Sequence, residues 1–69
     1  MSEMLIENKK TGRILILLDG SQWEVELYDT TISCLWLPTS EIKIVNLNGD
    51  LCLLKNTSND TEVRARRIN

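Results

Sequence analysis

Short runs of apolar residues, several of them alternating with polar ones, recur along this chain and are separated by turn-forming residues. Alternation with a period of two is typical of β-strands that bury one face, and it is clearest in "EIKIVNL" and "TEVRARRI". Apolar residues do not keep a helical spacing over four turns in any stretch of the sequence. The pattern therefore predicts an all-β protein made of short strands.

The dipeptide Asp19-Gly20 is the first turn signal, since Asp-Gly between apolar segments is a strong indicator of a β-hairpin. A two-residue loop at this point would place Ile16 opposite Trp23 and Arg13 opposite Glu26. We expect the following residues to share one buried face: Ile14, Ile16, Trp23, Val25 and Leu27. Because the chain has no Phe to fill the interior, Trp23 is predicted to lie in the core.

Two further turns are predicted at Asn48-Gly49 and in the polar stretch 56–60. A two-residue loop at the first turn places Val45 opposite Cys52. The second turn is expected to join two strands in which these residues face one another: Lys55 and Glu62, Leu54 and Val63, Cys52 and Ala65, Asp50 and Arg67. The second buried face is then expected to consist of Val45, Leu47, Cys52, Leu54, Val63 and Ala65.

The segment between these hairpins is predicted to hold a turn at 29–31, a short strand at 32–37 and a break at Pro38, which cannot donate to a ladder. The N-terminal segment, residues 1–12, either adds a strand or is a loose end. Residues 13–69 are expected to form a single small domain. The predicted fold is a small antiparallel barrel, SH3-like or related, with five to six short strands.

Charge and composition narrow the function classes. The 69 residues are 42% hydrophobic with a net charge of −2, which disfavours binding to nucleic acid or to an anionic membrane. The charge is uneven, because residues 61–69 carry three arginines against one acidic residue. The N-terminus lacks the features of a secretion signal, and no apolar run approaches the ~20 residues of a membrane span. We therefore expect a cytoplasmic protein without a membrane association.

Catalytic constellations are sparse. The chain has no histidine, and its two cysteines, Cys34 and Cys52, have no companion that would complete a zinc site. In a reducing compartment both thiols are expected to stay free and to pack as small apolar side chains, with a disulfide as the alternative. The sequence predicts a protein that is not an enzyme and needs no cofactor or metal.

Two groups of residues are candidates for contact with a partner. The first is Trp36 with its neighbours Leu37 and Pro38, where an indole ring beside a broken strand is either a core residue or a half-exposed hot spot. The second is the face of Arg64 and Arg66. Surplus apolar residues on both faces of the predicted hairpins also point to a partner chain or to self-association.

Two resemblances bear on the fold. "ELYDT", residues 26–30, resembles the Ala-Leu-Tyr-Asp-Tyr stretch of SH3 domains, but Thr30 replaces the second tyrosine, and the Trp-Trp pair and Pro-x-x-Tyr segment are absent. This similarity implies a barrel shape and no peptide recognition. "DGSQWEV", "WLPTSEI" and "VRARR" resemble a group of short bacterial proteins of uncharacterised function, which implies a compact all-β fold and no catalytic residue, cofactor or known partner.

The sequence therefore favours a non-catalytic binding or accessory module that acts through protein–protein contact. The alternative is a small nucleic-acid-binding barrel that uses Arg64, Arg66 and Arg67.

Overall fold

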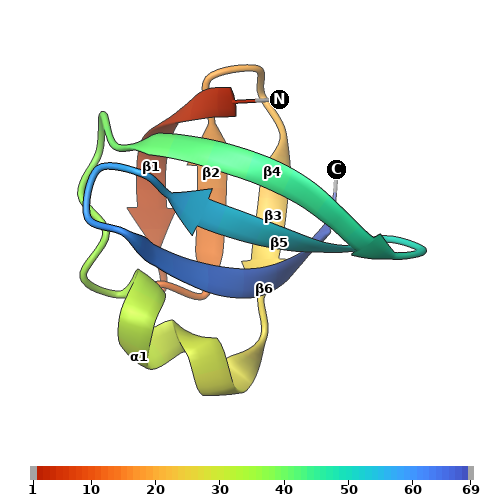
Figure 1. The fold of residues 1–69 in the computed structure, drawn as a ribbon. Coiled ribbons are helices and arrows are strands. Elements are labelled where there is room, and N and C mark those ends of the chain that lie inside the picture. The colour runs from red at the N-terminus through yellow and green to blue at the C-terminus, as the bar shows by residue number, and fades with distance from the viewer. Residues whose placement is uncertain (1, 69) are drawn as a thin grey trace.

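A computed structural model describes residues 2–68, in which six antiparallel strands close into a barrel (Figure 1). The strands are β1 (Ser2–Lys9), β2 (Ile14–Leu17), β3 (Gln22–Val25), β4 (Glu41–Asn48), β5 (Leu51–Asn56) and β6 (Thr61–Arg67). Their order around the barrel is β1-β2-β3-β6-β5-β4. The predicted all-β fold, a small antiparallel barrel of five to six short strands, is confirmed.

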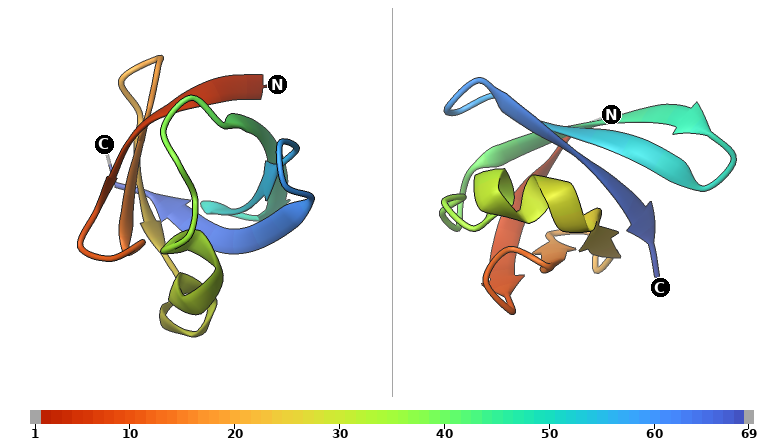
Figure 2. Two further views of the ribbon diagram at one scale, coloured as in Figure 1. Left: turned by 90° about the vertical axis from the view of Figure 1, so that its left-hand side faces the viewer. Right: turned by 90° about the horizontal axis from the view of Figure 1, so that it is seen from below.

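The barrel consists of two three-stranded meanders that pair with each other along β3–β6 and β1–β4. The link between the meanders is helical, with a 3₁₀ turn η1 (Leu27–Asp29) followed by α1 (Thr30–Ser33). Figure 2 shows this helical segment at one end of the barrel. Within residues 2–68, no helix is long and apolar enough to span a bilayer.

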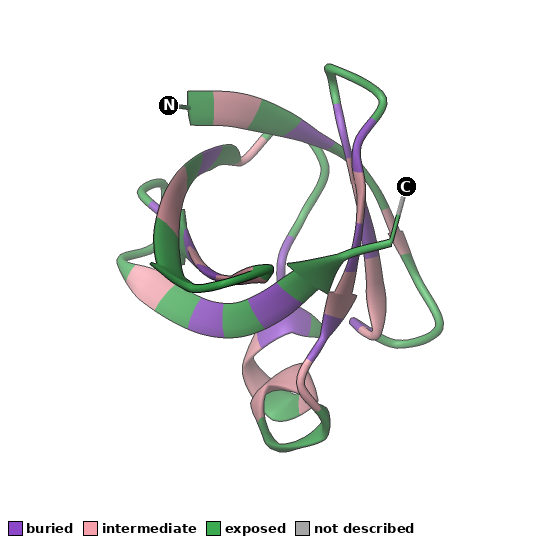
Figure 3. Ribbon diagram, turned by 90° about the vertical axis from the view of Figure 1, so that its right-hand side faces the viewer, coloured by how far each residue is buried: buried purple, intermediate pink, exposed green. Residues whose placement is uncertain are grey.

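The barrel interior is filled mainly by aliphatic side chains around two indole rings, and burial alternates along the strands (Figure 3). The buried core consists of Leu5, Leu15, Leu17, Trp23, Val25, Trp36, Ile42, Cys52, Leu54, Val63 and Ala65. Both indole N–H groups donate to hydroxyl oxygens, that of Trp23 to Ser21 at 2.9 Å and that of Trp36 to Thr61 at 2.8 Å. Both indole N–H groups are therefore paired inside the core.

The first hairpin forms where it was predicted, but its register is one residue away from the expected one. Trp23 lies opposite Leu15 instead of Ile16, and the loop has three residues, 18–20. A two-residue type I′ loop needs positive φ at both Asp19 and Gly20, whereas only Gly20 has it, at 88°. The Gly20 N–H bonds to the Leu17 carbonyl at 2.9 Å, which closes a turn that ends in a left-handed glycine.

A slip of one residue turns every side chain of a strand to its other face. Leu15 and Leu17 are therefore buried, and Ile14 and Ile16 lie half-buried on the outside, so their predicted placement was wrong. Trp23 and Val25 are in the core as predicted. The remaining residue of the expected face, Leu27, is exposed in η1, and the expected Arg13–Glu26 pair is replaced by an ion pair of Arg13 with Glu24.

The second hairpin is also shifted. Val45 faces Leu53 instead of Cys52, and the register changes between Asn46 and Asn48, where Leu47 is the extra residue of a bulge. Ile42 is buried and Ile44 packs against the core, whereas Val45 and Leu47 point away from it. The loop is at 49–50, and the bulge at Leu47 places Asn46 and Ile44 opposite the buried Cys52 and Leu54, so the prediction of Val45 and Leu47 as core residues was wrong.

The third turn has the predicted register. In the β5–β6 pair, Cys52 lies opposite Ala65, Leu54 opposite Val63 and Lys55 opposite Glu62. The four apolar residues of this pair are buried as expected. The last expected pair is altered, because Asp50 lies in the turn and forms an ion pair with Arg66 at 3.4 Å. The β5–β6 register is uninterrupted, whereas the β4–β5 register shifts at its bulge.

Two further segments remain, the N-terminal residues and the predicted strand at 32–37. The N-terminal residues form β1, which pairs with both β2 and β4 and belongs to the closed barrel. The predicted strand at 32–37 was wrong: residues 30–33 are helical, and the residues that follow form a turn and a loop.

Candidate functional site

The helical link and the loop after it, residues 27–37, form what we call the cap. Local hydrogen bonds hold its first turns: the Thr30 hydroxyl donates to the Leu27 carbonyl at 2.8 Å, and the Cys34 N–H donates to the Thr30 carbonyl at 2.9 Å. Such short helices are marginal by themselves, so bonds to the rest of the protein must support the cap.

Distant strands supply this support. A carboxylate oxygen of Asp29 accepts the Arg64 N–H of β6 at 2.8 Å. The Asn8 side-chain amide of β1 donates to the carbonyls of Ser33 and Trp36, at 2.8 and 2.9 Å. These carbonyls lie at and beyond the C-terminal end of α1, where helix carbonyls lack partners within the helix. A side chain of the first meander and a backbone N–H of the second therefore position the cap.

The turn between β1 and β2 lies against the cap and is strained. Lys10, Thr11 and Gly12 all have positive φ, at 54°, 56° and 89°. The Arg13 N–H bonds to the Lys10 carbonyl at 3.2 Å across the turn. A β-branched residue such as Thr11 is rarely found at positive φ, and backbone strain of this kind concentrates at functional sites.

Gly12 lies directly against the cap. A Cβ atom at position 12 would lie 2.4 Å from the backbone nitrogen of Cys34 and 2.7 Å from the Ser33 hydroxyl oxygen. The Ser33 hydroxyl donates to the Gly12 carbonyl at 2.6 Å. Only glycine allows both the backbone conformation and the contact, and the contact holds the turn and the cap side by side.

A groove of about 420 Å³ opens between the turn and the cap. This volume is within the range of ~300–1,000 Å³ that is usual for ligand sites. Its lining consists of two cationic side chains, three threonines, one aliphatic residue and one thiol, contributed by Lys10, Arg13, Thr11, Thr30, Thr31, Leu27 and Cys34. None of these lining residues is acidic, which sets the groove apart in a chain with a net charge of −2.

Of the two cationic side chains that line the groove, Arg13 forms an ion pair and Lys10 does not. The Arg13 guanidinium forms an ion pair with Glu24, with Nη2 3.2 Å from a carboxylate oxygen. Its Nε is buried and has no hydrogen-bond partner among residues 2–68. Lys10 is exposed and forms no ion pair with the part of the chain that the structure describes. Lys10 thus remains as an exposed cationic donor for an anionic group in the groove.

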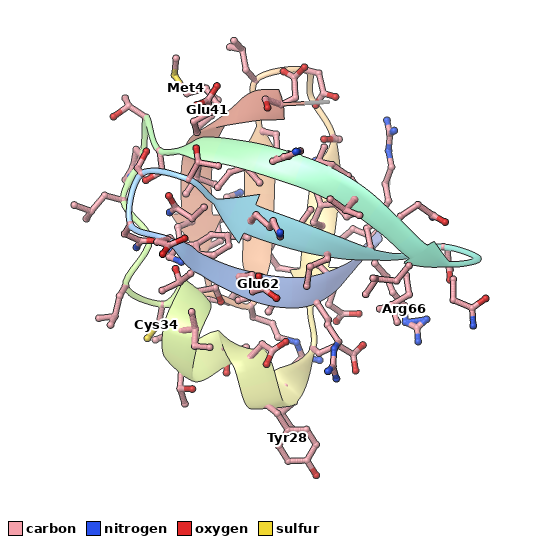
Figure 4. All side chains as sticks on the ribbon, viewed as in Figure 1. Met4, Tyr28, Cys34, Glu41, Glu62 and Arg66 are labelled. Carbon is pink, nitrogen blue, oxygen red and sulfur yellow. The ribbon has the colours of Figure 1, made fainter. Side chains whose placement is uncertain are left out.

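The cap also concentrates exposed apolar surface. Leu27, Tyr28, Leu35 and Leu37 are 65%, 92%, 73% and 72% exposed. They are four of the nine large apolar residues exposed within residues 2–68, although the cap is only eleven residues long. Figure 4 shows the Tyr28 ring pointing away from the barrel into solvent, and Cys34 on another side of the cap. Clustered exposed apolar side chains mark interaction surfaces more often than scattered ones do.

Of the first candidate group, two residues are on the surface and one is not. Trp36 is only 2% exposed, so the indole ring is a core residue and cannot serve as a surface contact. Leu37 and Pro38 are exposed beside it. Trp36 points inward, where its indole N–H reaches the Thr61 hydroxyl, and its two leucine neighbours are exposed.

The second candidate group lies elsewhere. Arg64 and Arg66 are exposed on the outer face of β6, and Figure 4 shows Arg66 at the side opposite the loop of Leu37 and Pro38. Arg66 is near two carboxylates, Glu26 at 3.6 Å and Asp50 at 3.4 Å. The structure therefore does not bring the two predicted groups together into one surface.

The cysteines differ from each other. Both are free, and Cys52 is buried in the core as expected. Cys34 is exposed at the end of α1, so its predicted burial was wrong. Among residues 2–68, no group of three or more histidine, cysteine or acidic side chains could hold a metal ion.

Sequence reasoning missed most of the groove. Lys10, Thr11 and Arg13 belong to "KKTGR", where Thr-Gly between two apolar segments is a turn signal but does not indicate what the turn packs against. The other wall, from Leu27 to Cys34, has no such signal because long-range bonds stabilise it.

In comparisons with known proteins, no family model, curated protein or solved structure matches the chain.

Proposed function

We propose that this protein is a non-catalytic binding module that contacts a partner protein through the cap and the adjoining groove. The observation that carries the proposal is the concentration of four highly exposed apolar side chains on an eleven-residue cap. Exposing such side chains to water is unfavourable, and a partner that covers them recovers the hydrophobic free energy. Of the residues predicted from the sequence, Leu37 and Pro38 belong to this surface or directly follow it.

The competing surface is the outer face of β4 and β5, where apolar side chains also face outward. Val45, Leu51 and Leu53 on this face are half-buried by their neighbours. Leu27 and Tyr28 of the cap are far more exposed, so their burial by a partner would remove more apolar area from water. The cap is therefore the better candidate for the protein contact.

The nucleic-acid alternative rests on Arg64, Arg66 and Arg67. Arg66 lies between two carboxylates, which already compensate part of its charge. Polyanion binding would show steep salt dependence and would weaken on replacement of Arg64 and Arg66 by alanine. A salt titration with single-stranded DNA separates this function from the proposed one.

Site-specific photocrosslinking in the producing cell tests the proposal. Benzoylphenylalanine replaces Tyr28 or Leu35 in the cap, and Lys43 on the outer face of β4 serves as the matched exposed control. We expect discrete adducts of higher mass from positions 28 and 35 and none from position 43. Equal adducts from all three positions, or none from the cap, would reject the proposal. An adduct of twice the chain mass would identify the partner as a second copy.

A further inference from the structure

We infer that the groove binds an acidic, aliphatic segment of the partner protein, an inference that rests on the proposed function. Such a segment would place a carboxylate against Lys10 and Arg13 and an aliphatic side chain against Leu27. The groove, and not the apolar cap surface alone, then decides which partner is accepted.

Charge complementarity is the first step of the argument. The groove is lined by two cations and no acid, while the chain as a whole is negative. A neutral or basic segment would leave Lys10, which has no ion pair within residues 2–68, without a counter-charge. A carboxylate supplies that counter-charge, and hydrogen bonds between charged groups are stronger than neutral ones.

The lining also offers neutral donors. Thr11, Thr30 and Thr31 place three hydroxyl groups around the same space. The Thr30 hydroxyl already donates to the Leu27 carbonyl, so it remains available only as an acceptor. The hydroxyls of Thr11 and Thr31 can turn to donate to an oxygen of the segment, either a carboxylate or a backbone carbonyl.

The apolar surroundings favour a protein over a nucleic acid as the source of the anion. Leu27 lines the groove, and Tyr28 and Leu35 extend the exposed apolar surface of the cap. A polyphosphate backbone offers nothing to these side chains and would meet the net negative charge of the molecule. An acidic segment with aliphatic residues matches both parts of the site.

Titration of the ¹⁵N-labelled full chain, followed by NMR, tests this inference with a capped pentapeptide in which glutamate and leucine alternate. One comparison peptide has lysine in place of glutamate, and another has serine in place of leucine. We expect the acidic, aliphatic peptide to shift the amide signals of Thr11, Leu27 and Thr31, and both comparison peptides to bind more weakly by about tenfold.

Matched charge reversals locate the site. Lys10→Glu should weaken binding of the acidic peptide by about tenfold, whereas Lys43→Glu, with the same change of charge on the outer face of β4, should change it by less than about twofold. Because Lys10 has positive φ, Lys10→Asn is the second variant: asparagine tolerates this conformation and removes the charge without straining the turn.

Each outcome is decisive. Equal binding of the lysine peptide, equal effects of the two charge reversals, or tighter binding of single-stranded DNA at the same amides would overturn the inference. If cap positions still form crosslinks in that case, the proposed function stands and only the chemistry assigned to the groove is wrong. If the peptide binds as expected and the cap forms no crosslink, the proposed function fails instead.

Discussion

Gly12 illustrates how a single residue supports the site. It lies in the left-handed region at a φ of 89°, and its Cα faces the backbone of Cys34 closely enough to exclude a methyl group. Gly20 has nearly the same φ, 88°, but nothing lies within 4 Å of the position of its missing Cβ. The two glycines therefore share a conformational requirement and differ only in a contact.

Replacing each glycine by alanine separates these effects. Gly20→Ala should lower the free energy of unfolding by about 1 kcal/mol, the usual cost of alanine at positive φ. Gly12→Ala should lower it by about 2–4 kcal/mol, because the methyl group must also displace the cap. Urea unfolding followed by circular dichroism measures both values. Equal losses for the two variants would show that the contact between Gly12 and Cys34 contributes nothing.

Asp19 is the titratable residue whose environment most clearly favours one charge state. Its Oδ1 accepts the Ser21 hydroxyl at 2.6 Å and the Ser21 N–H at 2.9 Å. These hydrogen bonds, the side-chain one foremost, hold the pKa of Asp19 below its ordinary value. The same Ser21 hydroxyl accepts the indole N–H of Trp23, so the carboxylate orders a chain of bonds that ends in the core.

Acidification should weaken this chain of bonds. A carboxyl whose folded-state pKa is lowered contributes its full stability above the pKa of the unfolded chain, about pH 4, and loses it as the pH falls through the folded-state value. Between pH 5 and 2, the wild type should therefore lose more unfolding free energy than Asp19→Asn, by at most about 0.5 kcal/mol since the group is exposed. Unfolding in urea at each pH measures the difference, and parallel curves for the two proteins would contradict the prediction.

Among the strands, the outer face of the β4–β5–β6 sheet carries a row of three charges. Lys43 lies directly opposite Lys55, and Lys55 lies opposite Glu62. Like charges at directly opposed positions are destabilising, whereas the Lys55–Glu62 pair is favourable. The row therefore contains one repulsive pair, Lys43 and Lys55, which a substitution can remove.

Lys43→Glu should raise the free energy of unfolding by about 0.5 kcal/mol at low ionic strength, because it converts the opposed lysines into an opposite-charge pair. Lys55→Glu is the matched control: it gains a pair with Lys43 and loses the pair with Glu62, so we expect almost no change. Thermal unfolding at low and high salt measures both. A gain for Lys43→Glu that persists in high salt would mean that charge is not its cause.

The barrel as a whole depends on two indole rings in a core whose other members are aliphatic side chains and one cysteine. Trp23 is 4% exposed and Trp36 is 2% exposed, at different positions in the chain but within one continuous cluster. Closing the sheet around them pairs β1 with β4 and β3 with β6, so that neither meander has a free edge in the barrel.

Tryptophan fluorescence should report this burial. Iodide is expected to quench the native protein several-fold less than the urea-unfolded protein, since the ion cannot reach either ring in the folded barrel. In a Trp23→Phe variant, the remaining emission comes from Trp36 and should be protected to the same degree. Efficient quenching of that variant would place Trp36 at the surface and would contradict the packing against Thr61.

Much of the strand pattern could be predicted from sequence, and the errors have two physical causes. Turn residues located the hairpins to within one residue, but a three-residue loop reversed the faces of β2, and the bulge at Leu47 reversed those of β4. The cap could not be predicted, because its partners are far away in sequence: Ser33 bonds to Gly12, and Asp29 to Arg64. For the same reason the burial of Trp36 could not be decided from sequence, because its hydrogen-bond partner, Thr61, lies on the last strand.

What the chain determines by itself is therefore local: the all-β class, the three hairpin turns, the β5–β6 register and the placement of Trp23 inside. These features follow from residues adjacent in sequence, where turn chemistry and alternation act directly. The tertiary structure alone decided the loop length in the first hairpin, the helical cap and the groove against "KKTGR". The cap and the groove depend on close packing between segments distant in sequence, such as Gly12 and Ser33, and no local pattern encodes that contact.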